Sequence, residues 1–552
     1  MTSGADDSCW TRRGFLRAGT AALLTAAPLR RGLFASTGRL AGAMGRLPAD
    51  FGPGDFSIPQ ALALRAIDAA RSAGAAYADA RLTRTVEQEI PGQLTRDWEE
   101  LAISVRALVH GYWGFAASPL WDAEEAAQLG REAVAQAKAL ARTTPRTVDL
   151  GPSVVASGTW SMPVRSDPFA IPLEEKIDFL ESISGVAAGN RRNLYRQLVS
   201  TSGSVTFARQ ERTVGTTEGA LFSQVVYRSE VNVTLNLGDG SSGSAQVQAK
   251  GSGIAAKGWE HVLDMKPHDQ IPALIEQAEM ELGLPRKPVE IGRYDLVLDG
   301  EATAHLLDST IGIATDLDRV VGNEADAAGT SYIDDPLGML GSFAVGSALL
   351  TVTGDRSERG GLATVRWDDE GVEPAVTTLI KDGILNDFPT TREQASWLAP
   401  WYERQGQPIR SRGCARADSA LNITMGFAPN LTMRPGAVDV AFEDLIRDVK
   451  RGIAVIGGYS LTDFQARNGR GAGRLMREIV NGKLGAVIEH GTFLFNSVEV
   501  WKGLMALGGA RSVTTIAGWL TKGQPPQSCL HSVTAPAAVF KNVAIIDGTK
   551  RA

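Results

Sequence analysis

Residues 294–298, Tyr-Asp-Leu-Val-Leu, and residues 301–307, Glu-Ala-Thr-Ala-His-Leu-Leu, decide the fold of this chain. The first run is typical of a buried strand, and the second begins a helix rich in alanine and leucine at about Ala302. Asp308-Ser309-Thr310-Ile311-Gly312-Ile313 follows without a break. This strand-to-helix unit opens a region, residues 291–548, whose other elements we expect to be mostly short strands.

Turns and helix stops divide the rest of this region. Lys381-Asp382-Gly383 and Asn481-Gly482-Lys483 have the residue types of hairpin turns. Helices are predicted for residues 442–451, ended by Gly452, and for residues 498–507. The sequence therefore predicts a β-rich C-terminal domain.

The first ordered region, residues 58–145, predicts helices and strands together. Residues 62–73 and 124–141 have helical composition, and residues 103–109 alternate with a period of two, as a half-buried strand does. We expect this region to form an N-terminal α/β domain. Its aromatic residues Trp113 and Phe115 are expected in the core.

Residues 146–290 predict a central domain after a proline-containing linker. A helix is expected from about Leu173, and strands over residues 204–207 and 224–237. The glycine- and serine-rich residues 238–253 predict a loop or a hairpin tip. The fold class predicted for the whole chain is α+β.

The composition is that of an ordinary globular protein. The 552 residues are enough for two to four domains, and 43% hydrophobic and 21% charged residues are typical of them. The net charge of −6 argues against a nucleic-acid-binding surface, which needs a basic patch. After the first forty residues, no segment reaches the roughly 20 apolar residues that span a bilayer, so no membrane span is expected in the mature protein.

The first forty residues predict an export signal. Thr11-Arg12-Arg13-Gly14-Phe15-Leu16-Arg17 has the paired arginines of a twin-arginine signal, and a short, weakly apolar stretch, residues 18–28, follows it. This stretch is too short for a membrane anchor, so we interpret it as a targeting segment. The alternative is a chance arginine pair beside an alanine-rich helix. The signal predicts export of folded protein to the periplasm, where Cys414 and Cys529 are free to form one disulfide or to remain thiols.

Several stretches, in a fixed order along the chain, carry a family resemblance. They are Ala66 to Arg81, His110 to Ala116, Asp167-Pro168-Phe169, Thr217-Glu218-Gly219, Glu301 to Leu307, Gly329-Thr330-Ser331, Pro429 to Gly436, Lys450 to Ile453, Lys522-Gly523-Gln524 and Phe540 to Val543. Through them the chain resembles the TldD/PmbA family of metallopeptidases and their paired subunits, over roughly residues 58–547. The resemblance implies a cleft in the C-terminal half that takes peptides, and a dimer, either a homodimer or a heterodimer with a TldD/PmbA-type paralogue.

The resemblance also implies a zinc site, and this chain departs from it. Family members hold zinc with a His-Glu-x-x-x-His stretch directly after the paired leucines and with a distant cysteine. Zinc lowers the pKa of a bound water, and the glutamate acts as general base. Here the histidine positions are Asp308 and Ile313, the glutamate position is Ser309, and the cysteine position is Leu520. Because Ile313 and Leu520 offer no donor atom, no cofactor is expected.

The spacing of the two histidine positions predicts an irregular helix. Residues five apart on a regular α-helix point about 140° away from each other. Positions 308 and 313 converge on one ion only if the backbone is distorted near Gly312, which a glycine permits.

Other residues are candidates for a substitute metal site or a substitute catalytic pair. His305 and Asp308 share a helix face, with Asp316 and Asp318 close by, and are weak candidates for a substitute metal site, against a solvated polar face. Cys529 and His531, two apart on a strand, are a candidate nucleophile and base, against two structural residues.

Two further stretches suggest binding. Residues 410–416, with three arginines, suggest a loop that binds a carboxylate or the partner subunit, and the alternative is a solvated loop. Residues 469–474 look like a phosphate loop but lack the strand-to-helix context, so we expect an ordinary glycine loop.

Three functions remain open from the sequence. The chain is predicted to be a non-catalytic, peptidase-like subunit; the alternatives are an active hydrolase with a rearranged site and a periplasmic peptide-binding protein. An intact zinc-motif paralogue encoded beside this gene would favour the first.

Export gives the first testable prediction. Changing Arg12 and Arg13 to Lys should leave folded protein in the cytoplasm, because the arginine pair is the recognised part of the signal. Cell fractionation and immunoblotting measure this, with Arg17→Lys as the matched control. Normal periplasmic yield of the double variant would show that the signal assignment is wrong.

Overall fold

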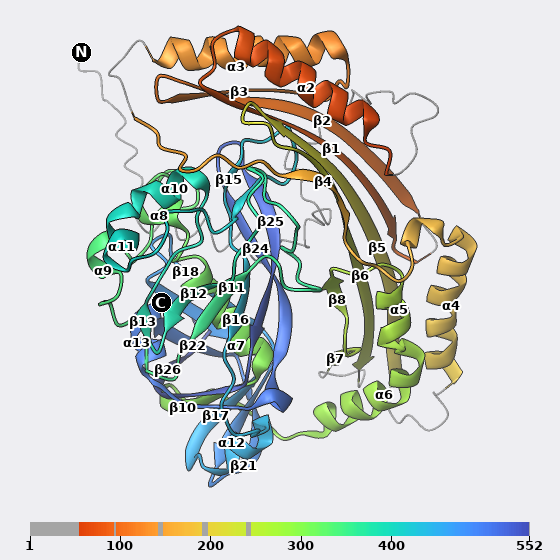
Figure 1. Cartoon of the computed structure of the whole chain (residues 1–552). Coiled ribbons are helices and arrows are strands. Elements are labelled where there is room, and N and C mark those ends of the chain that lie inside the picture. The colour runs from red at the N-terminus through yellow and green to blue at the C-terminus, as the bar shows by residue number, and fades with distance from the viewer. Residues whose placement is uncertain (1–53, 93–94, 142–146, 190–196, 239–243, 551–552) are drawn as a thin grey trace, which may run out of the picture. The chain divides into compact units, whose positions relative to one another are not determined.

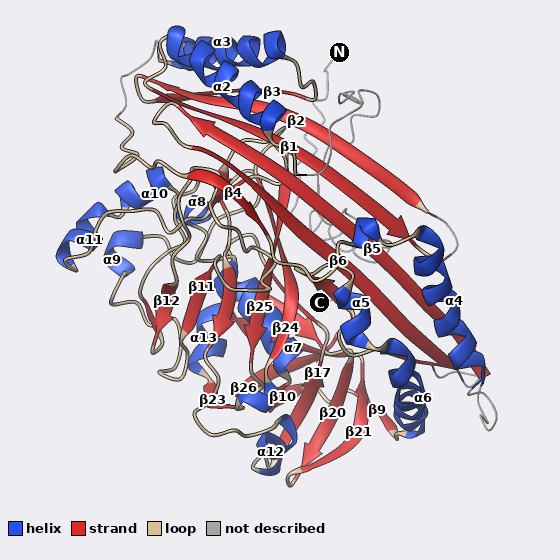
Figure 2. Ribbon diagram, turned by 45° about the vertical axis from the view of Figure 1, so that its right-hand side comes forward, coloured by secondary structure: helices blue, strands red, loops and turns tan. Residues whose placement is uncertain are grey.

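The structure is a computed structural model that describes residues 54–92, 95–141, 147–189, 197–238 and 244–550. The predicted export signal, with Arg12 and Arg13, lies outside these ranges. In the part of the chain that is described, no helix is long and apolar enough to cross a membrane. Sheets and helices combine in an α+β fold, which confirms the predicted class (Figures 1 and 2).

The first sheet is built from long, mostly antiparallel strands. In the order in which they lie side by side, these are β3 (Tyr112–Ser118), β2 (Arg96–Val109), β1 (Tyr77–Ile90), β5 (Gln197–Thr216), β6 (Leu221–Gly238) and β4 (Ser157–Ser161), with β7 (Ser244–Gln248) and β8 (Gly253–Ala255) also paired to β6. β1 and β5 pair from Asp79↔Thr216 to Ile90↔Val205. Strands on both sides of the predicted 145/146 boundary therefore share one sheet, and the domain boundaries stay a prediction.

Helices cover one face of this sheet. α2 (Ser57–Ser72) and α3 (Ala123–Leu140) pack on its first strands over an alanine-rich core, and α4 (Leu173–Gly189) and α6 (Pro267–Gly283) pack on its other end. α5 (Glu260–Met265) precedes α6, and the short turn η1 (Pro168–Ala170) precedes α4. A Cβ at Gly130 of α3 would lie 2.4 Å from the Ala66 carbonyl oxygen of α2, so the glycine lets the two helices touch.

The described residues of the C-terminal half form two further large sheets and one two-stranded sheet. The second sheet has the order β18 (Tyr459–Thr462), β19 (Asn468–Ala472), β22 (Gly491–Asn496), β26 (Ala538–Asp547), β10 (Gly292–Leu298), β17 (Arg451–Ile456), β20 (Leu475–Val480), β21 (Lys483–Glu489) and β9 (Arg286–Pro288), with β23 (Leu504–Leu507) also paired to β26. The third has the order β13 (Ile384–Leu385), β12 (Thr377–Lys381), β11 (Val352–Asp355), β16 (Asn430–Met433), β25 (Gln527–Ala535) and β24 (Thr514–Lys522), and β14 (Ala415–Arg416) pairs with β15 (Met425–Gly426).

Helix α7 (Gly300–Leu307) connects the two sheets by packing. It follows β10 and contacts β18 of the second sheet and both β24 and β25 of the third. The remaining helices are η2 (Asp308–Gly312), α8 (Leu317–Val320), α9 (Pro336–Met339), α10 (Arg392–Trp397), α11 (Ala399–Arg404), α12 (Phe442–Arg447), α13 (Ser497–Lys502) and η3 (Ala510–Ser512). The predicted strand-to-helix unit is confirmed as β10 and α7, and it lies in the largest apolar core.

Both predicted hairpin turns are confirmed. Asp382 and Gly383 have φ of +48° and +83°, and Asn481 and Gly482 have φ of +48° and +75°. Two successive positive φ values define the turn whose twist matches a two-stranded hairpin. These turns join β12 to β13 and β20 to β21.

Two predicted helices and one predicted loop differ in part from the structure. The helix predicted over residues 498–507 ends at Lys502, and β23 pairs with β26 after it. The helix predicted over residues 442–451 ends at Arg447, because Arg451 already begins β17 beside β10. Within the stretch 238–253, strand β7 pairs antiparallel with β6, which agrees with the hairpin alternative and shows that the stretch is not only a loop. For the two helices, pairing with a distant strand outweighs local propensity.

Residues 469–474 also differ from the predicted glycine loop. Residues 468–472 form β19, between β18 and β22. A Cβ at Gly469 would lie 2.3 Å from the ring of Phe495, and a Cβ at Gly471 would lie 2.2 Å from the ring of Phe493. The glycines therefore make room for two aromatic side chains of the neighbouring strand.

The inner face of the first sheet is polar and meets the C-terminal half through buried ion pairs. Asp369 accepts hydrogen bonds from Arg81 of β1 (3.0 Å), from Arg212 of β5 and from the Ala417 backbone N–H (2.9 Å). Arg106 of β2 pairs at 3.0 Å with Glu370. Asp369 is 1% exposed. A single carboxylate therefore ties two strands of the sheet to two loops of the C-terminal half.

Replacing Asp369 should destabilise the fold strongly. In Asp369→Asn, Arg81 and Arg212 become buried cations with an uncharged partner, which costs about 3–5 kcal/mol. Equilibrium urea unfolding measures the loss. The matched control, Asp68→Asn, removes an exposed partner of Arg71 and should cost less than about 0.5 kcal/mol.

The same variant should show a pH dependence of known sign. Burial alone raises the pKa of Asp369, but Arg212, Arg81 and Arg356 outweigh it, so the pKa lies below its usual value. The stabilisation is present above the unfolded pKa of about 4 and is lost as the pH falls through the folded pKa. The difference between wild type and Asp369→Asn should therefore shrink in acid; a difference that grows there would contradict the ion-pair assignment.

Candidate functional site

The site predicted from the lost ligand positions begins with a distorted helix. α7 ends at Leu307, and residues 308–312 form a π-helical turn in which the Ile313 N–H donates to the Asp308 carbonyl oxygen at 3.0 Å. The wider turn brings residues five apart closer to one face. The predicted distortion between positions 308 and 313 is confirmed.

Gly312 is required by space in this turn. A Cβ there would lie 2.8 Å from Asp308 Oδ1 and 2.9 Å from a methyl carbon of Leu431. Its φ is not positive, so the left-handed freedom of glycine is not what the turn uses. The glycine instead leaves room for the Asp308 carboxylate.

Asp308 is held by a histidine from far along the chain. His531 Nε2 lies 2.8 Å from Asp308 Oδ1, and the His531 side chain is 2% exposed. Gly518, opposite His531 in the β24–β25 ladder, leaves room for this pair, since a Cβ there would lie within 2.8 Å of both side chains. The first histidine position of the family motif is therefore occupied by half of an Asp–His pair.

The other two ligand positions converge on the same pair of strands but are filled by hydrocarbon. Leu520 of β24 lies opposite Cys529 of β25, and both are buried with Phe427, while Ile313 packs against the same cluster. Positions 308, 313 and 520 thus lie around the β24–β25 ladder, as a three-ligand site requires. The donor set does not fit zinc, because isoleucine and leucine have no lone pair to donate.

Ser309 hydrogen-bonds within its own helical segment, and His305 is half-buried. The Ser309 hydroxyl donates to the Leu306 carbonyl oxygen at 3.3 Å, one turn back in the helix. Burial lowers the pKa of His305, against the opposing charge of Asp308. Within the described ranges, no three His, Cys, Asp or Glu side chains lie close enough together to hold a metal ion.

Asp316 and Asp318 bind a buried lysine. Lys522 Nζ lies 2.8 Å from Asp316 Oδ1 and 2.8 Å from Asp318 Oδ2, and 5.1 Å from the centre of the Phe427 ring. Burial lowers the pKa of Lys522, but the two carboxylates outweigh it and hold the pKa above its usual value. In the sequence, Lys522 belongs to Lys522-Gly523-Gln524, one of the stretches that carry the family resemblance. A lone lysine after a strand gave no signal of its two aspartate partners, about two hundred residues earlier.

The Cys529–His531 candidate is not assembled as a reactive pair. Cys414 and Cys529 are buried free thiols and form no disulfide with each other. Burial raises the pKa of Cys529 to about 11, and His531 is bonded to Asp308 instead. A neutral thiol is a poor nucleophile.

The arginines of residues 410–416 mostly point inward. Arg412 pairs with Asp387 at 2.7 Å and lies over the Tyr402 ring, and Arg416 donates to the Leu530 carbonyl oxygen at 2.7 Å. The alternative of a solvated loop is therefore wrong for these two residues, because their guanidinium groups bond within the protein. The binding alternative stays a prediction.

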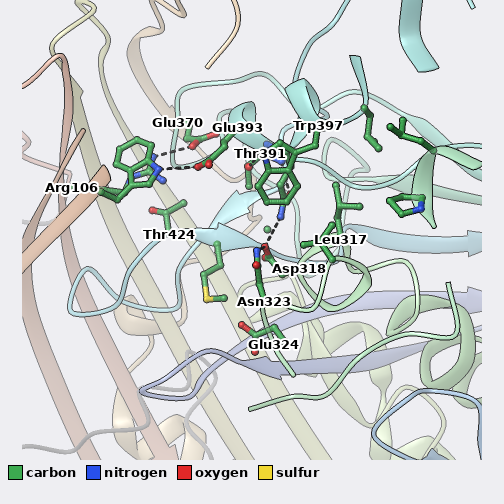
Figure 3. A pocket seen from close by; sticks show the side chains of 18 residues that line it. Arg106, Leu317, Asp318, Asn323, Glu324, Glu370, Thr391, Glu393, Trp397 and Thr424 are labelled. Carbon is green, nitrogen blue, oxygen red and sulfur yellow. Dashed lines mark hydrogen bonds and ion pairs between the residues drawn. The ribbon is translucent and has the colours of Figure 1, made fainter. Parts of the chain in front are cut away.

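A cavity of about 650 Å³ lies beside the Leu520 cluster (Figure 3). Its lining consists of Arg106, Trp113, Leu317, Asp318, Val321, Asn323, Glu324, Pro336, Leu337, Glu370, Thr391, Glu393, Gln394, Trp397, Leu398, Thr424, Met425 and Gly426. Met425 connects it to the cluster of Ile313 and Leu520, and Asp318 connects it to Lys522. Its volume falls within the range of small-ligand sites, roughly 300–1,000 Å³.

The cavity wall joins the first sheet to the C-terminal half. Trp113 Nε1 donates to Glu393 Oε2 at 2.9 Å, and the Arg106 guanidinium lies 4.3 Å from the centre of the Trp113 ring. Gln394, which also lines the cavity, donates to Asp318 at 2.9 Å. The expectation that Trp113 belongs to the core is wrong: it is half-buried at the cavity. Aromatic rings, aliphatic side chains and carboxylates together suit a peptide with apolar and basic groups.

Comparison with known proteins places this fold among metallopeptidases. Residues 291–547 match the PmbA/TldA metallopeptidase C-terminal domain, and residues 166–273 match the central domain of the same family. A metalloprotease of Methanocaldococcus jannaschii is 26% identical over 356 residues, which cover 64% of this chain and 71% of that protein. A zinc metalloprotease TldD homolog of Saccharolobus solfataricus is 25% identical over 248 residues, covering 43% and 51%.

Solved structures show the same fold. A candidate modulator of DNA gyrase from Thermotoga maritima superposes with a TM-score of 0.65 at 15% identity, covering 88% of this chain and 99% of that one. TldE from Thermococcus kodakarensis superposes with a TM-score of 0.59 at 16% identity, with the same coverage. The class is therefore that of PmbA/TldD metallopeptidase folds. The chain belongs to the TldD/PmbA family.

Restoring the donors tests whether the site geometry survives. Asp308→His, Ser309→Glu, Ile313→His and Leu520→Cys together should let the dialysed protein retain about one zinc per chain at neutral pH, because the positions already converge. Elemental analysis measures this. Affinity should fall in acid, since zinc needs neutral imidazole and thiolate.

Two proteins control this experiment. Wild type should retain well below one zinc per chain, and the variant that keeps Leu520 should bind more weakly than the full set. A folded quadruple variant without zinc would show that the positions do not form a site. Stoichiometric zinc in wild type would overturn the conclusion that the donor set does not fit.

Proposed function

We propose that this chain is a non-catalytic member of its family that holds peptides without hydrolysing them. One observation carries the proposal: the three ligand positions lie around one strand pair, yet Ile313 and Leu520 fill their places with hydrocarbon and Asp308 is bonded to His531. A water activated for attack on a peptide carbonyl needs a metal or a base at that point. Neither Ile313 nor Leu520 can supply one.

The adjacent cavity is the proposed peptide-binding surface. Trp113 and Trp397 offer aromatic faces, and Asp318, Glu370 and Glu393 surround them with negative charge. Such a wall binds apolar side chains by burial and basic groups by charge and cation–π contact. The lost ligand positions lie next to it through Met425, so a bound peptide would pass the former catalytic point unchanged.

The proposal includes a partner and a location. A non-catalytic family member is useful as one half of a dimer whose other half carries intact zinc ligands, so we infer pairing with such a paralogue; a homodimer is the alternative. The paired arginines Arg12 and Arg13 support twin-arginine export, which would carry the folded assembly to the periplasm.

A rearranged hydrolase is the second candidate. His531 Nδ1 is buried and has no hydrogen-bond partner, while Nε2 is oriented by Asp308. A histidine with one nitrogen bound by a carboxylate and the other free is the arrangement of a general base. Under this alternative, His531 and not zinc would activate the nucleophile.

Peptide binding and cleavage separate the two candidates. Purified protein should bind a fluorescein-labelled, unstructured casein peptide in an anisotropy titration and leave it intact by mass spectrometry. Trp397→Ala should weaken binding about tenfold or more, because a buried aromatic contact is lost. Leu461→Ala, at an exposed leucine outside the cavity, is the matched control and should bind normally.

The outcomes are distinct. Binding that Trp397→Ala leaves unchanged would exclude the cavity as the site. Cleavage that disappears in His531→Ala would establish the rearranged hydrolase instead, and cleavage that disappears with a zinc chelator would contradict both candidates.

A further inference from the structure

A second, much smaller cavity lies between the inner face of the first sheet and the C-terminal half. It measures about 10 Å³ and is lined by Gln210, Arg212, Gln224, Val226, Arg228, Arg356, Val365 and Arg416. That is about the volume needed for one water-sized occupant. The four arginines come from β5, β6, the loop after β11 and β14, and each is at least nine-tenths buried.

The hydrogen bonds of two of these arginines, Arg356 and Arg416, leave much of their positive charge uncompensated. Arg356 donates to the carbonyl oxygens of residues Ala363, Gly413 and Ala415. Arg416 donates to the Leu530 carbonyl oxygen, and among the described residues its other guanidinium N–H groups have no acceptor. A carbonyl satisfies a donor but carries no charge, and burying an unneutralised cation is costly.

Nearby acidic groups supply only part of the missing charge, because Asp368 and Asp369 attract Arg356 electrostatically but neither lies within ion-pair distance of it. Asp369 pairs with Arg212, but the same carboxylate also pairs with Arg81. In the described part of the chain, neither Arg356 nor Arg416 has a carboxylate within ion-pair distance. The Cys529 thiol lies near Arg416, but burial raises its pKa to about 11, so it is neutral at pH 7.

The two glutamines of the cavity do not offer a negative group either. Gln210 Oε1 accepts from Arg212, and its amide donates to Thr85 and to the Asp418 carbonyl oxygen. Gln224 donates to the Trp367 carbonyl oxygen at 2.8 Å and its Oε1 accepts from the Arg366 backbone N–H. Both side-chain amides are hydrogen-bonded within the protein. The polar groups that remain to face the cavity are therefore guanidinium groups.

We propose that this cavity binds one monatomic anion of the size of chloride, held by the guanidinium groups of Arg356 and Arg416. The small volume excludes phosphate, sulfate and carboxylates, and guanidinium N–H groups are strong donors to anions. The anion neutralises the seam between the sheet and the C-terminal half, so it stabilises the way these two parts pack. This site is separate from the peptide cavity and does not depend on the proposed function.

Linkage between anion and folding tests the proposal. At constant ionic strength, sodium gluconate is exchanged for sodium chloride and urea unfolding of the full chain is measured. An anion bound only by the folded protein raises the folding equilibrium constant about 100-fold at 100 times its dissociation constant. We expect a saturable rise with chloride and with bromide. No anion-specific rise would overturn the proposal.

Two variants locate the effect. Arg416→Met should lose the chloride dependence, because it removes a ligand and one uncompensated charge, and should lose less stability in gluconate than in chloride. The matched control Arg447→Met, at a side chain that is 71% exposed, should keep the full dependence. Equal chloride responses in wild type and Arg416→Met would place the anion elsewhere and reject this cavity.

Crystallography provides a readout that does not need a variant to fold. In wild-type crystals grown with bromide in place of chloride, an anomalous peak is expected between Arg356 and Arg416. A peak at crystal concentration without the linked gain in stability would be an adventitious ion only. Ordered water without anomalous signal would likewise contradict the proposal.

Discussion

A buried carboxylate, Asp369, is the interaction on which the arrangement of the two halves depends. The inner face of the first sheet carries arginines at positions where a core sheet would carry aliphatic side chains, and Asp369 accepts hydrogen bonds from Arg81 and Arg212 at once. Burying these cations against another layer is favourable only if their charge is met. The loop that carries Asp369 and Glu370 must therefore lie against the sheet, and both cavities form along this seam.

The ligand positions that the family resemblance implies lie beside one strand pair, although two of their side chains carry no donor atom. The π-helical turn, the space at Gly312 and Gly518, and the β24–β25 ladder together hold positions 308, 313 and 520 beside the same pair of strands. The side chains at two of those positions now pack as part of the core. Their contacts with the surrounding apolar cluster contribute hydrophobic stabilisation at this turn.

The excess charge around the two cavities has opposite sign. Around the larger cavity, Lys522 pairs with Asp316 and Asp318, and Arg106 pairs with Asp79 and Glu370, so carboxylates outnumber cations in these ion pairs. Around the smaller one, arginines meet mostly carbonyl oxygens and the excess is positive. The first arrangement suits basic or neutral peptides, and the second suits an anion.

The sequence by itself determined the family, the α+β class, the strand-to-helix unit at residues 294–307 and both hairpin turns, because these depend on local residue patterns. It also determined that Ile313 and Leu520 cannot bind zinc, which follows from residue type alone. Spacing even predicted the distorted turn before Gly312. The short strands β19 and β23 were missed, because their pairing partners outweigh local propensity.

Only the tertiary structure decided what surrounds these residues. In the folded chain, His531 contacts Asp308, 223 positions earlier, and Lys522 lies between two aspartates. Trp113 lies at a cavity wall and not in the core, and four arginines from four separate segments line the smaller cavity. Such contacts depend on sheet order and on the packing of distant segments, and a single sequence without aligned relatives carries no local signal of either.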